Sequence, residues 1–130
     1  MKRAYIGMVM WMIVSTSWIM GSFTEKCQTA ATTSELIDCL SADVREREEK
    51  LARMLVRLHG LLDKEASAQL KRAESAWEVY RDSNCLCASG LHAGGSLEPV
   101  DLVACKDRMT DDRLKELKLT YKEALGTAEK

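Results

Sequence analysis

The chain reads Trp77-Glu78-Val79-Tyr80-Arg81-Asp82-Ser83-Asn84-Cys85 near its middle, and this stretch decides the fold. Its aromatic residues continue an apolar seam in which four- and three-residue steps alternate, made of Ala66, Leu70, Ala73, Trp77 and Tyr80. Such steps are typical of an amphipathic helix with one buried face. We therefore predict a helix from about Lys64 to Asn84, with Trp77 as its main core anchor.

A longer apolar stripe precedes this helix. Thr32 and Glu35 have the spacing of a capping box, which predicts a helix start near Thr32 or Thr33. The stripe consists of Leu36, Leu40, Val44, Leu51, Leu55, Leu58 and Leu62. The turn at 61–63 is short, so we expect the two helices to form an antiparallel hairpin with Trp77 against Leu51 or Leu55.

Residues 86–96 interrupt the pattern, because they contain three glycines and no apolar period. Ser96 is positioned to cap a third helix, with Pro99 in its first turn. The apolar stripe of this helix is Val100, Val103, Leu114, Leu117, Tyr121 and Leu125. Thr110, followed by two aspartates, resembles a fresh cap, so we expect a bend there. The predicted fold is all-α, a disulfide-stapled hairpin plus a bent third helix over residues 27–125, with a frayed tail at 126–130.

The N-terminus has the layout of a secretory signal peptide over residues 1–22. Lys2 and Arg3 precede an uncharged run from Ala4 to Met20. That run is slightly shorter than the ~20 residues that span a bilayer, so an uncleaved anchor stays an alternative and would give the only membrane contact. Cleavage would reduce the 19 basic residues to 17, against 20 acids, a net charge of about −3. This charge is too mild to predict a nucleic-acid partner. We expect export to the periplasm or beyond.

Five cysteines in a small exported chain predict a disulfide framework with one thiol left over. A zinc site made of Cys85, Cys87, His92 and Cys105 is the rival interpretation. The Cys85-x-Cys87 spacing is one residue tighter than the usual zinc knuckle, and an oxidising compartment favours disulfides. We predict neither a metal nor a cofactor.

No set of residues predicts catalysis. His59 and His92 have no serine or aspartate partner suggested by spacing. The acids of the third helix fit the solvated face of an amphipathic helix better than a pair of glycosidase carboxylates; they are Glu98, Asp101, Asp107, Asp111 and Asp112. We therefore do not expect an enzyme.

Four motifs occur in a characteristic order along the chain. They are Glu35-Leu36-x-x-Cys39, Trp77-x-x-Tyr80-Arg81-Asp82-x-x-Cys85, Gly94-Gly95-Ser96 with Pro99 and Cys105, and Thr110-x-x-Arg113-x-x-Glu116-Leu117. This order resembles the small exported LprI-type lysozyme-inhibitor family of bacteria over about residues 27 to 120. The resemblance implies a secreted helical binding module that inhibits a lysozyme-like hydrolase. The alternative is a periplasmic structural or envelope-stress interaction protein that binds no lysozyme.

The family pattern accounts for Cys39, Cys85 and Cys105, and often for a cysteine near Cys27. The resemblance therefore favours disulfides Cys27–Cys39 and Cys85–Cys105, with Cys87 as the odd thiol. Cys87 lies two residues from Cys85, so it stays an alternative partner for Cys105.

The motif residues Trp77, Tyr80, Arg81, Asp82 and Arg113 are expected to be structural. Arg81 should reach carbonyls or an acid at the end of its helix. Asp82 should hold Arg113 in a bidentate pair that fixes the third helix.

The loop from Ser89 to Ser96 is the best candidate for contact with a partner. Leu91 and His92 would protrude into the hydrolase cleft, and Gly94 and Gly95 would let the backbone approach closely. A plain connector between two helices is the alternative for this loop.

Overall fold

The computed structural model describes residues 27–127, which fold into helices with no strand in that range. The elements are α1 (Thr33–Leu61), α2 (Lys64–Ser89), the short 3-10 helix η2 (Gly90–His92), α3 (Glu98–Thr120) and α4 (Lys122–Thr127). The predicted all-α fold is therefore confirmed. The expected signal peptide, residues 1–22, lies outside the described residues. Within the described range, no helix has the length and apolarity needed to cross a membrane.

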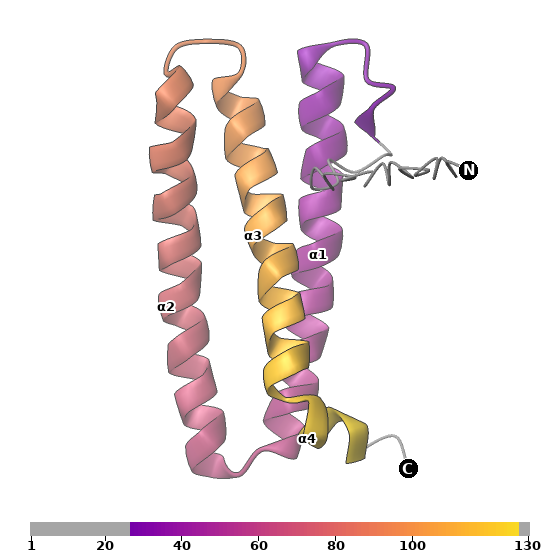
Figure 1. Ribbon diagram of the computed structural model, residues 1–130, viewed down its shortest axis with the longest axis vertical. Helices are drawn as coiled ribbons and strands as arrows, with labels where there is room; N and C mark the ends of the chain where they lie inside the picture. Colours follow the sequence, from indigo (N-terminus) through magenta and orange to yellow (C-terminus); the bar gives the residue numbers. More distant parts are fainter. Residues whose placement is uncertain (1–26, 128–130) are drawn as a thin grey trace, which may run out of the picture.

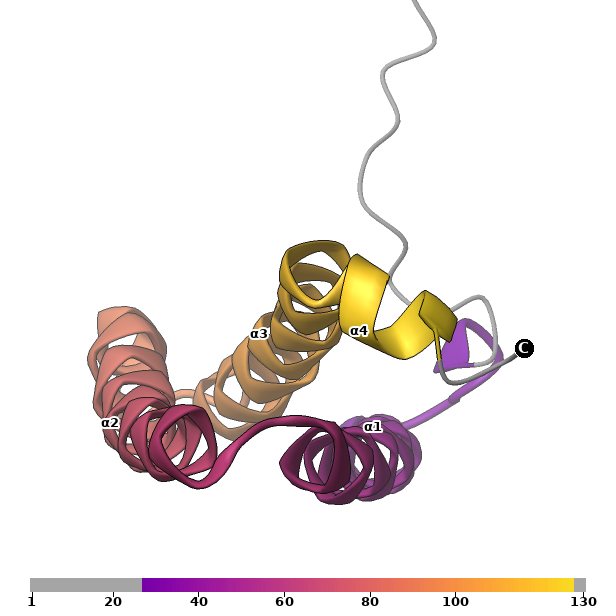
Figure 2. The same cartoon turned by 90° about the horizontal axis from the view of Figure 1, so that it is seen from below.

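The third long helix carries most of the packing between elements. α1 and α2 run antiparallel, as expected for a hairpin, but they touch each other little beyond the turn that joins them. α3 packs against both, and viewed from below it lies above the gap between them (Figures 1 and 2). The core therefore lies where α3 meets each of the other two helices.

Two groups of buried side chains make this core. The larger consists of Leu51 and Leu58 from α1, Leu70 from α2, and Leu114 and Leu117 from α3. Burying a leucine stabilises the fold by ~1.5–3 kcal/mol, so this cluster is the main apolar link among the three helices. The smaller group lies near the start of α1 and α3 and consists of Cys27, Leu40 and Val100.

Polar side chains fix the starts of the first two helices. The Thr32 hydroxyl accepts a hydrogen bond from the Glu35 backbone N–H at 3.2 Å, as the capping box predicted. The Glu35 carboxylate accepts from the backbone N–H of Ala31 at 2.8 Å. The Asp63 carboxylate caps α2 by accepting from the Ala66 N–H at 2.8 Å. α1 passes through Gly60 and ends one residue later.

The segment between α2 and α3 is shorter than predicted. α2 continues past Asn84 to Ser89, whose buried hydroxyl donates to the Leu86 carbonyl at 3.1 Å. The cap of α3 is Leu97, which makes no side-chain capping bond, so the prediction of Ser96 as the cap was wrong. Pro99 does lie in the first turn of α3, where its missing N–H costs nothing.

The fresh helix start predicted at Thr110 was wrong, because α3 is continuous from Glu98 to Thr120. The fully buried Thr110 hydroxyl donates to the Lys106 carbonyl one turn back, at 2.8 Å, and therefore does not cap a new helix. The chain turns at Tyr121 instead, and α4 returns against α1. α4 extends to Thr127, two residues into the tail that we expected to be frayed.

Candidate functional site

Both disulfides lie at the same end of the molecule. Cys27–Cys39 fastens the segment before α1 to that helix, and Cys85–Cys105 joins α2 to α3. Their Cα–Cα distances, 5.8 Å and 5.5 Å, are ordinary for disulfides. These are the pairs that we expected, and Cys87 is an exposed free thiol. The turn from α2 into α3 lies at this same end (Figure 1).

We call residues 27–44 and 83–105 the acidic end. They contain five acids and no lysine or arginine; the acids are Glu35, Asp38, Asp43, Glu98 and Asp101. Figure 1 shows the two segments together at one end of the helical bundle. The missing basic residues are visible in the sequence, but only the fold shows that the two segments are neighbours. These two segments therefore bring together an excess of negative charge, whereas acids and bases are mixed in the segments 45–82 and 106–127.

Exposed leucines accompany these acids at the turn between α2 and α3. Leu91 is 83% exposed, and Leu86 and Leu97 are also exposed. Neighbouring apolar side chains with a polar rim are a feature of protein-binding surfaces. The turn therefore has the composition of a contact surface.

Hydrogen bonds tie this turn to the start of α3. The Gly94 N–H donates to the Glu98 carboxylate at 2.7 Å, and the Gly95 N–H donates to the His92 carbonyl at 2.9 Å. His92 Nδ1 also contacts the Asp101 carboxylate. Gly94 has φ +77°, a conformation that favours glycine. Leu91 thus projects from a turn that hydrogen bonds stabilise, whereas the His92 side chain contacts Asp101 of α3. The partner-binding role of Leu91, His92, Gly94 and Gly95 stays a prediction.

Below the turn, Arg81 connects all three long helices. Its Nη1 donates to the Glu48 carboxylate of α1 at 3.0 Å and to the Thr110 hydroxyl of α3 at 3.3 Å. Its Nε donates to the neighbouring Asp82 at 3.0 Å. Arg81 therefore reaches an acid, as expected, and that acid belongs to the helix that α2 otherwise barely touches.

The predicted pair between Asp82 and Arg113 was wrong. Arg113 donates from Nε and Nη2 to one oxygen of Glu74, at 3.1 and 2.9 Å, and from Nη1 to Glu116 at 2.8 Å. Asp82 is held by Arg81 and by Lys106, whose Nζ lies 3.3 Å away. Burial acts to raise the pKa of Asp82, but hydrogen bonds from these two cations outweigh it and lower that pKa.

Trp77 lies at the edge of the core between two of these arginines. The guanidinium carbons of Arg81 and Arg113 are 5.2 and 5.8 Å from its ring centroid, within cation–π range. The ring is half-buried and packs against the larger core cluster. Tyr80, which the apolar seam placed beside it, is exposed. The buried face of α2 therefore includes Trp77 but not Tyr80, which the sequence pattern had placed on it.

Arg47 of α1 contacts two carboxylates of α3, and a third carboxylate, that of Asp43, acts on one of them. Arg47 Nε donates to Asp107 at 2.6 Å, and its Nη1 contacts Asp111. Burial raises the pKa of Asp107 in spite of Arg47, and the nearby Asp43 and Asp111 raise it further. Burial acts in the same direction at Asp111, but Lys115 and Arg47 outweigh it and lower the pKa. Asp43 Oδ2 is buried without a hydrogen-bond partner. Over residues 27–127, no group of three or more His, Cys, Asp or Glu side chains is arranged to hold a metal ion.

The comparisons with known proteins agree with the motif order. The family model described as lysozyme inhibitor LprI matches residues 24–117. An uncharacterized protein of Rhizobium meliloti is 32% identical over 105 residues, which cover 71% of this chain and 76% of that protein. No solved structure matches. The chain therefore belongs to the lysozyme inhibitor LprI family.

Proposed function

We propose that this protein is exported and inhibits a lysozyme-like hydrolase with its acidic end. One observation carries the proposal: the most exposed leucine, Leu91, projects from a hydrogen-bonded turn at the end that has five acids and no lysine or arginine. The family match supports lysozyme inhibition in general. The location of the contact surface is inferred from exposure and charge.

Charge would guide the encounter between the two proteins. A basic hydrolase is attracted to a negative surface, which raises the association rate more than the final affinity. Asp38 is exposed, and Glu98 and Asp101 are partly exposed. Each therefore has carboxylate oxygens accessible to a cation of the partner.

Apolar contact would supply most of the affinity after the encounter. Leu91 would insert into the substrate cleft and exclude the polysaccharide chain. Because Gly94 and Gly95 already hold the turn through hydrogen bonds, little conformational entropy is lost on binding. The Cys85–Cys105 disulfide supports the same turn from below.

The test is lysozyme turnover on a cell-wall substrate, measured with the exported protein and two matched variants. Leu91→Ala removes the projecting side chain, whereas Leu119→Ala removes an equally apolar side chain that is 73% exposed near the opposite end of α3. We expect Leu91→Ala to weaken inhibition by about tenfold, ~1.4 kcal/mol, and Leu119→Ala to leave it unchanged. Absence of inhibition by the unmodified protein would refute the function. Equal effects of the two substitutions would refute the site.

One observation favours a structural role in the envelope as a second candidate. Val79, Tyr80 and Leu86 are exposed along α2 beside the free thiol of Cys87. Such a face suits self-association of the chain. A stable dimer without any effect on lysozyme would favour this role over inhibition.

A further inference from the structure

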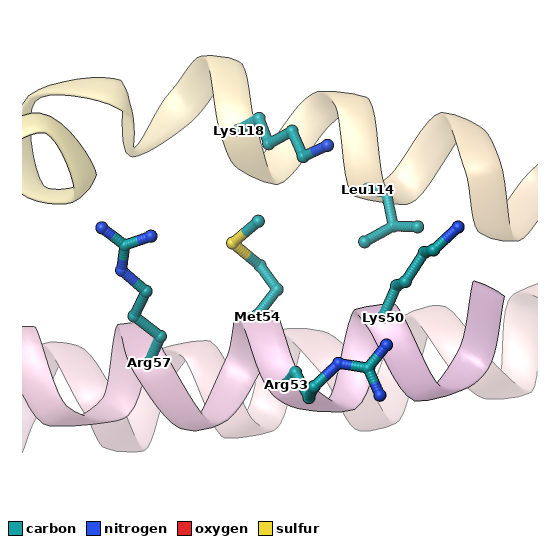
Figure 3. Close-up of a pocket in the computed structure, with 6 residues that line it drawn as sticks. All are labelled: Lys50, Arg53, Met54, Arg57, Leu114 and Lys118. Atoms are coloured by element: carbon teal, nitrogen blue, oxygen red, sulfur yellow. The ribbon is translucent and has the colours of Figure 1, made fainter. Parts of the chain in front are cut away.

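A second surface feature lies between α1 and α3, away from the acidic end. It is a pocket of about 280 Å³ lined by Lys50, Arg53, Met54, Arg57, Leu114 and Lys118 (Figure 3). Four of these six side chains are cationic and none is acidic. We call this feature the basic pocket.

The charges across the α1–α3 interface change from complementary to repulsive at this pocket. Towards the acidic end, Arg47 of α1 meets Asp107 and Asp111 of α3. In the next turns, Lys50 and Arg57 of α1 line the same pocket as Lys118 of α3, so cations face a cation. Like charges that line one pocket repel one another, although their exposure to water weakens this repulsion. An anion placed between them would convert this repulsion into attraction.

The acids that pair with Lys50 and Arg53 leave these two cations able to bind a ligand. Lys50 pairs with Glu46 at 2.7 Å and Arg53 with Glu49 at 3.5 Å, but all four side chains are about half exposed or more. Exposed pairs within one helix are weak and exchange readily. Lys118 is exposed, and its charge acts on Asp111 of the same helix without a direct ion pair among residues 27–127.

The position of Arg57 and the floor of the pocket restrict the kind of ligand. Arg57 Nη2 donates to the Leu125 carbonyl at 2.9 Å, which holds its guanidinium at the α4 edge. Figure 3 shows Met54 pointing into the space between the helices, and Leu114 forms the buried part of the floor. The pocket thus combines an apolar floor with a cationic rim.

We propose that the basic pocket binds a phosphate ester, with the phosphate between Lys50 of α1 and Lys118 of α3 and the organic part on Met54 and Leu114. Two ammonium groups from facing helices match the charge of a phosphate. The organic part of an ester, unlike inorganic phosphate, also uses the apolar floor. Lipid headgroups and soluble phosphorylated compounds share this chemistry. This site is independent of the proposed lysozyme inhibition.

Binding is tested with glycerol 3-phosphate, at an ionic strength matched with sodium chloride, by NMR titration of the exported protein. The pocket variant is Lys50→Gln with Lys118→Gln. The control is Lys64→Gln with Lys71→Gln, which removes the same charge from exposed positions on α2. We expect the pocket variant to bind at least tenfold more weakly, and the control to remain within twofold of the unmodified protein. Thermal melting adds a second measurement, because glycerol 3-phosphate should raise the midpoint of the unmodified protein and not that of the pocket variant.

Vesicles of phosphatidylglycerol, compared with phosphatidylcholine, distinguish the two sources of the phosphate. Pocket-dependent binding that is tighter to phosphatidylglycerol than to glycerol 3-phosphate identifies a lipid headgroup. Pocket-dependent binding to glycerol 3-phosphate alone identifies a soluble ester. Equal losses in the pocket variant and the control would show general charge attraction and overturn the proposal. Failure of the unmodified protein to bind any of the probes would overturn it as well.

Discussion

Arg113 of α3 donates two hydrogen bonds to one carboxylate oxygen of Glu74 on α2, and the two side chains are only 10% and 8% exposed. The Cys85–Cys105 disulfide explains this choice of partner. α2 and α3 run antiparallel, and Arg113 lies eight residues after Cys105, so it faces the region about eight residues before Cys85. That region contains Glu74 and Trp77. Asp82 lies closer to the disulfide, where it faces Lys106.

Removing Glu74 should therefore destabilise the fold much more than removing Asp82. Glu74→Ala leaves the Arg113 guanidinium buried with one acid fewer, an effect of ~3–5 kcal/mol for a broken buried pair. Asp82 is 47% exposed, and Asp82→Ala should cost no more than ~1 kcal/mol. Urea denaturation of the two variants checks this order. Equal midpoints would mean that the Glu74–Arg113 pair contributes little.

The two cysteines at the end of α2 should respond differently to substitution by serine. Cys85→Ser opens the link between α2 and α3 and should cost ~3 kcal/mol, the value for a loop of about this length. Cys87→Ser should leave the melting temperature unchanged and remove any disulfide-linked dimer. Thermal melting and non-reducing gels measure both effects. The opposite result would indicate that Cys87 is the native partner of Cys105 in solution.

The two aspartates that contact Arg47 should have opposite pH dependences. Asp107 has a pKa above its ordinary value of 3.8 when folded, so its contribution to stability is present at lower pH and is lost as pH rises through the folded pKa. Asp111 has a pKa below 3.8, so its contribution is present above that value and is lost as pH falls through the folded pKa. Denaturation at about pH 7 and about pH 3 should show Asp111→Asn costing more at the higher pH and Asp107→Asn costing more at the lower. The same pH trend for both variants would contradict this assignment.

Trp77 should stabilise the fold through its contacts with two arginines as well as through the burial of its ring. Trp77→Ala should cost ~3 kcal/mol, the lower part of the range for aromatic truncation, because the ring is only half-buried. Trp77→Leu keeps apolar volume but loses the contacts with Arg81 and Arg113, worth about 1 kcal/mol beyond the lost area. Leu58→Ala, at a side chain with no exposure, serves as the reference for a purely apolar loss. Chemical denaturation gives all three values.

Lysozyme inhibition should weaken as salt is added, mainly through the association rate. The acids of the acidic end act on an approaching partner at long range, and salt screens that attraction. Glu98→Gln with Asp101→Asn should slow association and reduce its dependence on salt, while dissociation changes less. Stopped-flow or surface-binding kinetics distinguish the two rates. A salt-independent association rate would exclude a role for the acidic end in steering.

The helices and their starts could be predicted from the sequence, whereas their arrangement could not. Thr32 with Glu35 and Asp63 with Ala66 are local capping contacts, so nearby residues determine them. The end of α2 was misplaced because 86–89 lacks an apolar period. The helix continues there beside the Cys85–Cys105 disulfide, which is a tertiary constraint.

The position of α3 against both other helices depends on which apolar faces meet, and periodicity alone does not specify this. In the candidate site, too, local features could be predicted from the sequence and contacts between helices could not. Leu91 and His92 are both exposed, as expected of a protruding loop, but the contact of His92 with Asp101 could not be predicted from the sequence. The buried partner of Arg113 required the register of α2 against α3. The Cys85–Cys105 disulfide fixes this register. The pairing of Arg113 with Glu74 could therefore have been predicted from the expected disulfide.

The unequal distribution of the disulfides also has a consequence for local unfolding. The covalent links lie at the acidic end, whereas no disulfide within residues 27–127 holds the turn between α1 and α2 or the short α4. Partial openings should therefore begin at the unlinked end, and amide protons there should exchange with solvent sooner than those around Cys105. The basic pocket joins α1 to α3 outside the part of the molecule that the disulfides link. A phosphate ester bound there would act as a reversible clamp where no cysteine connects the helices.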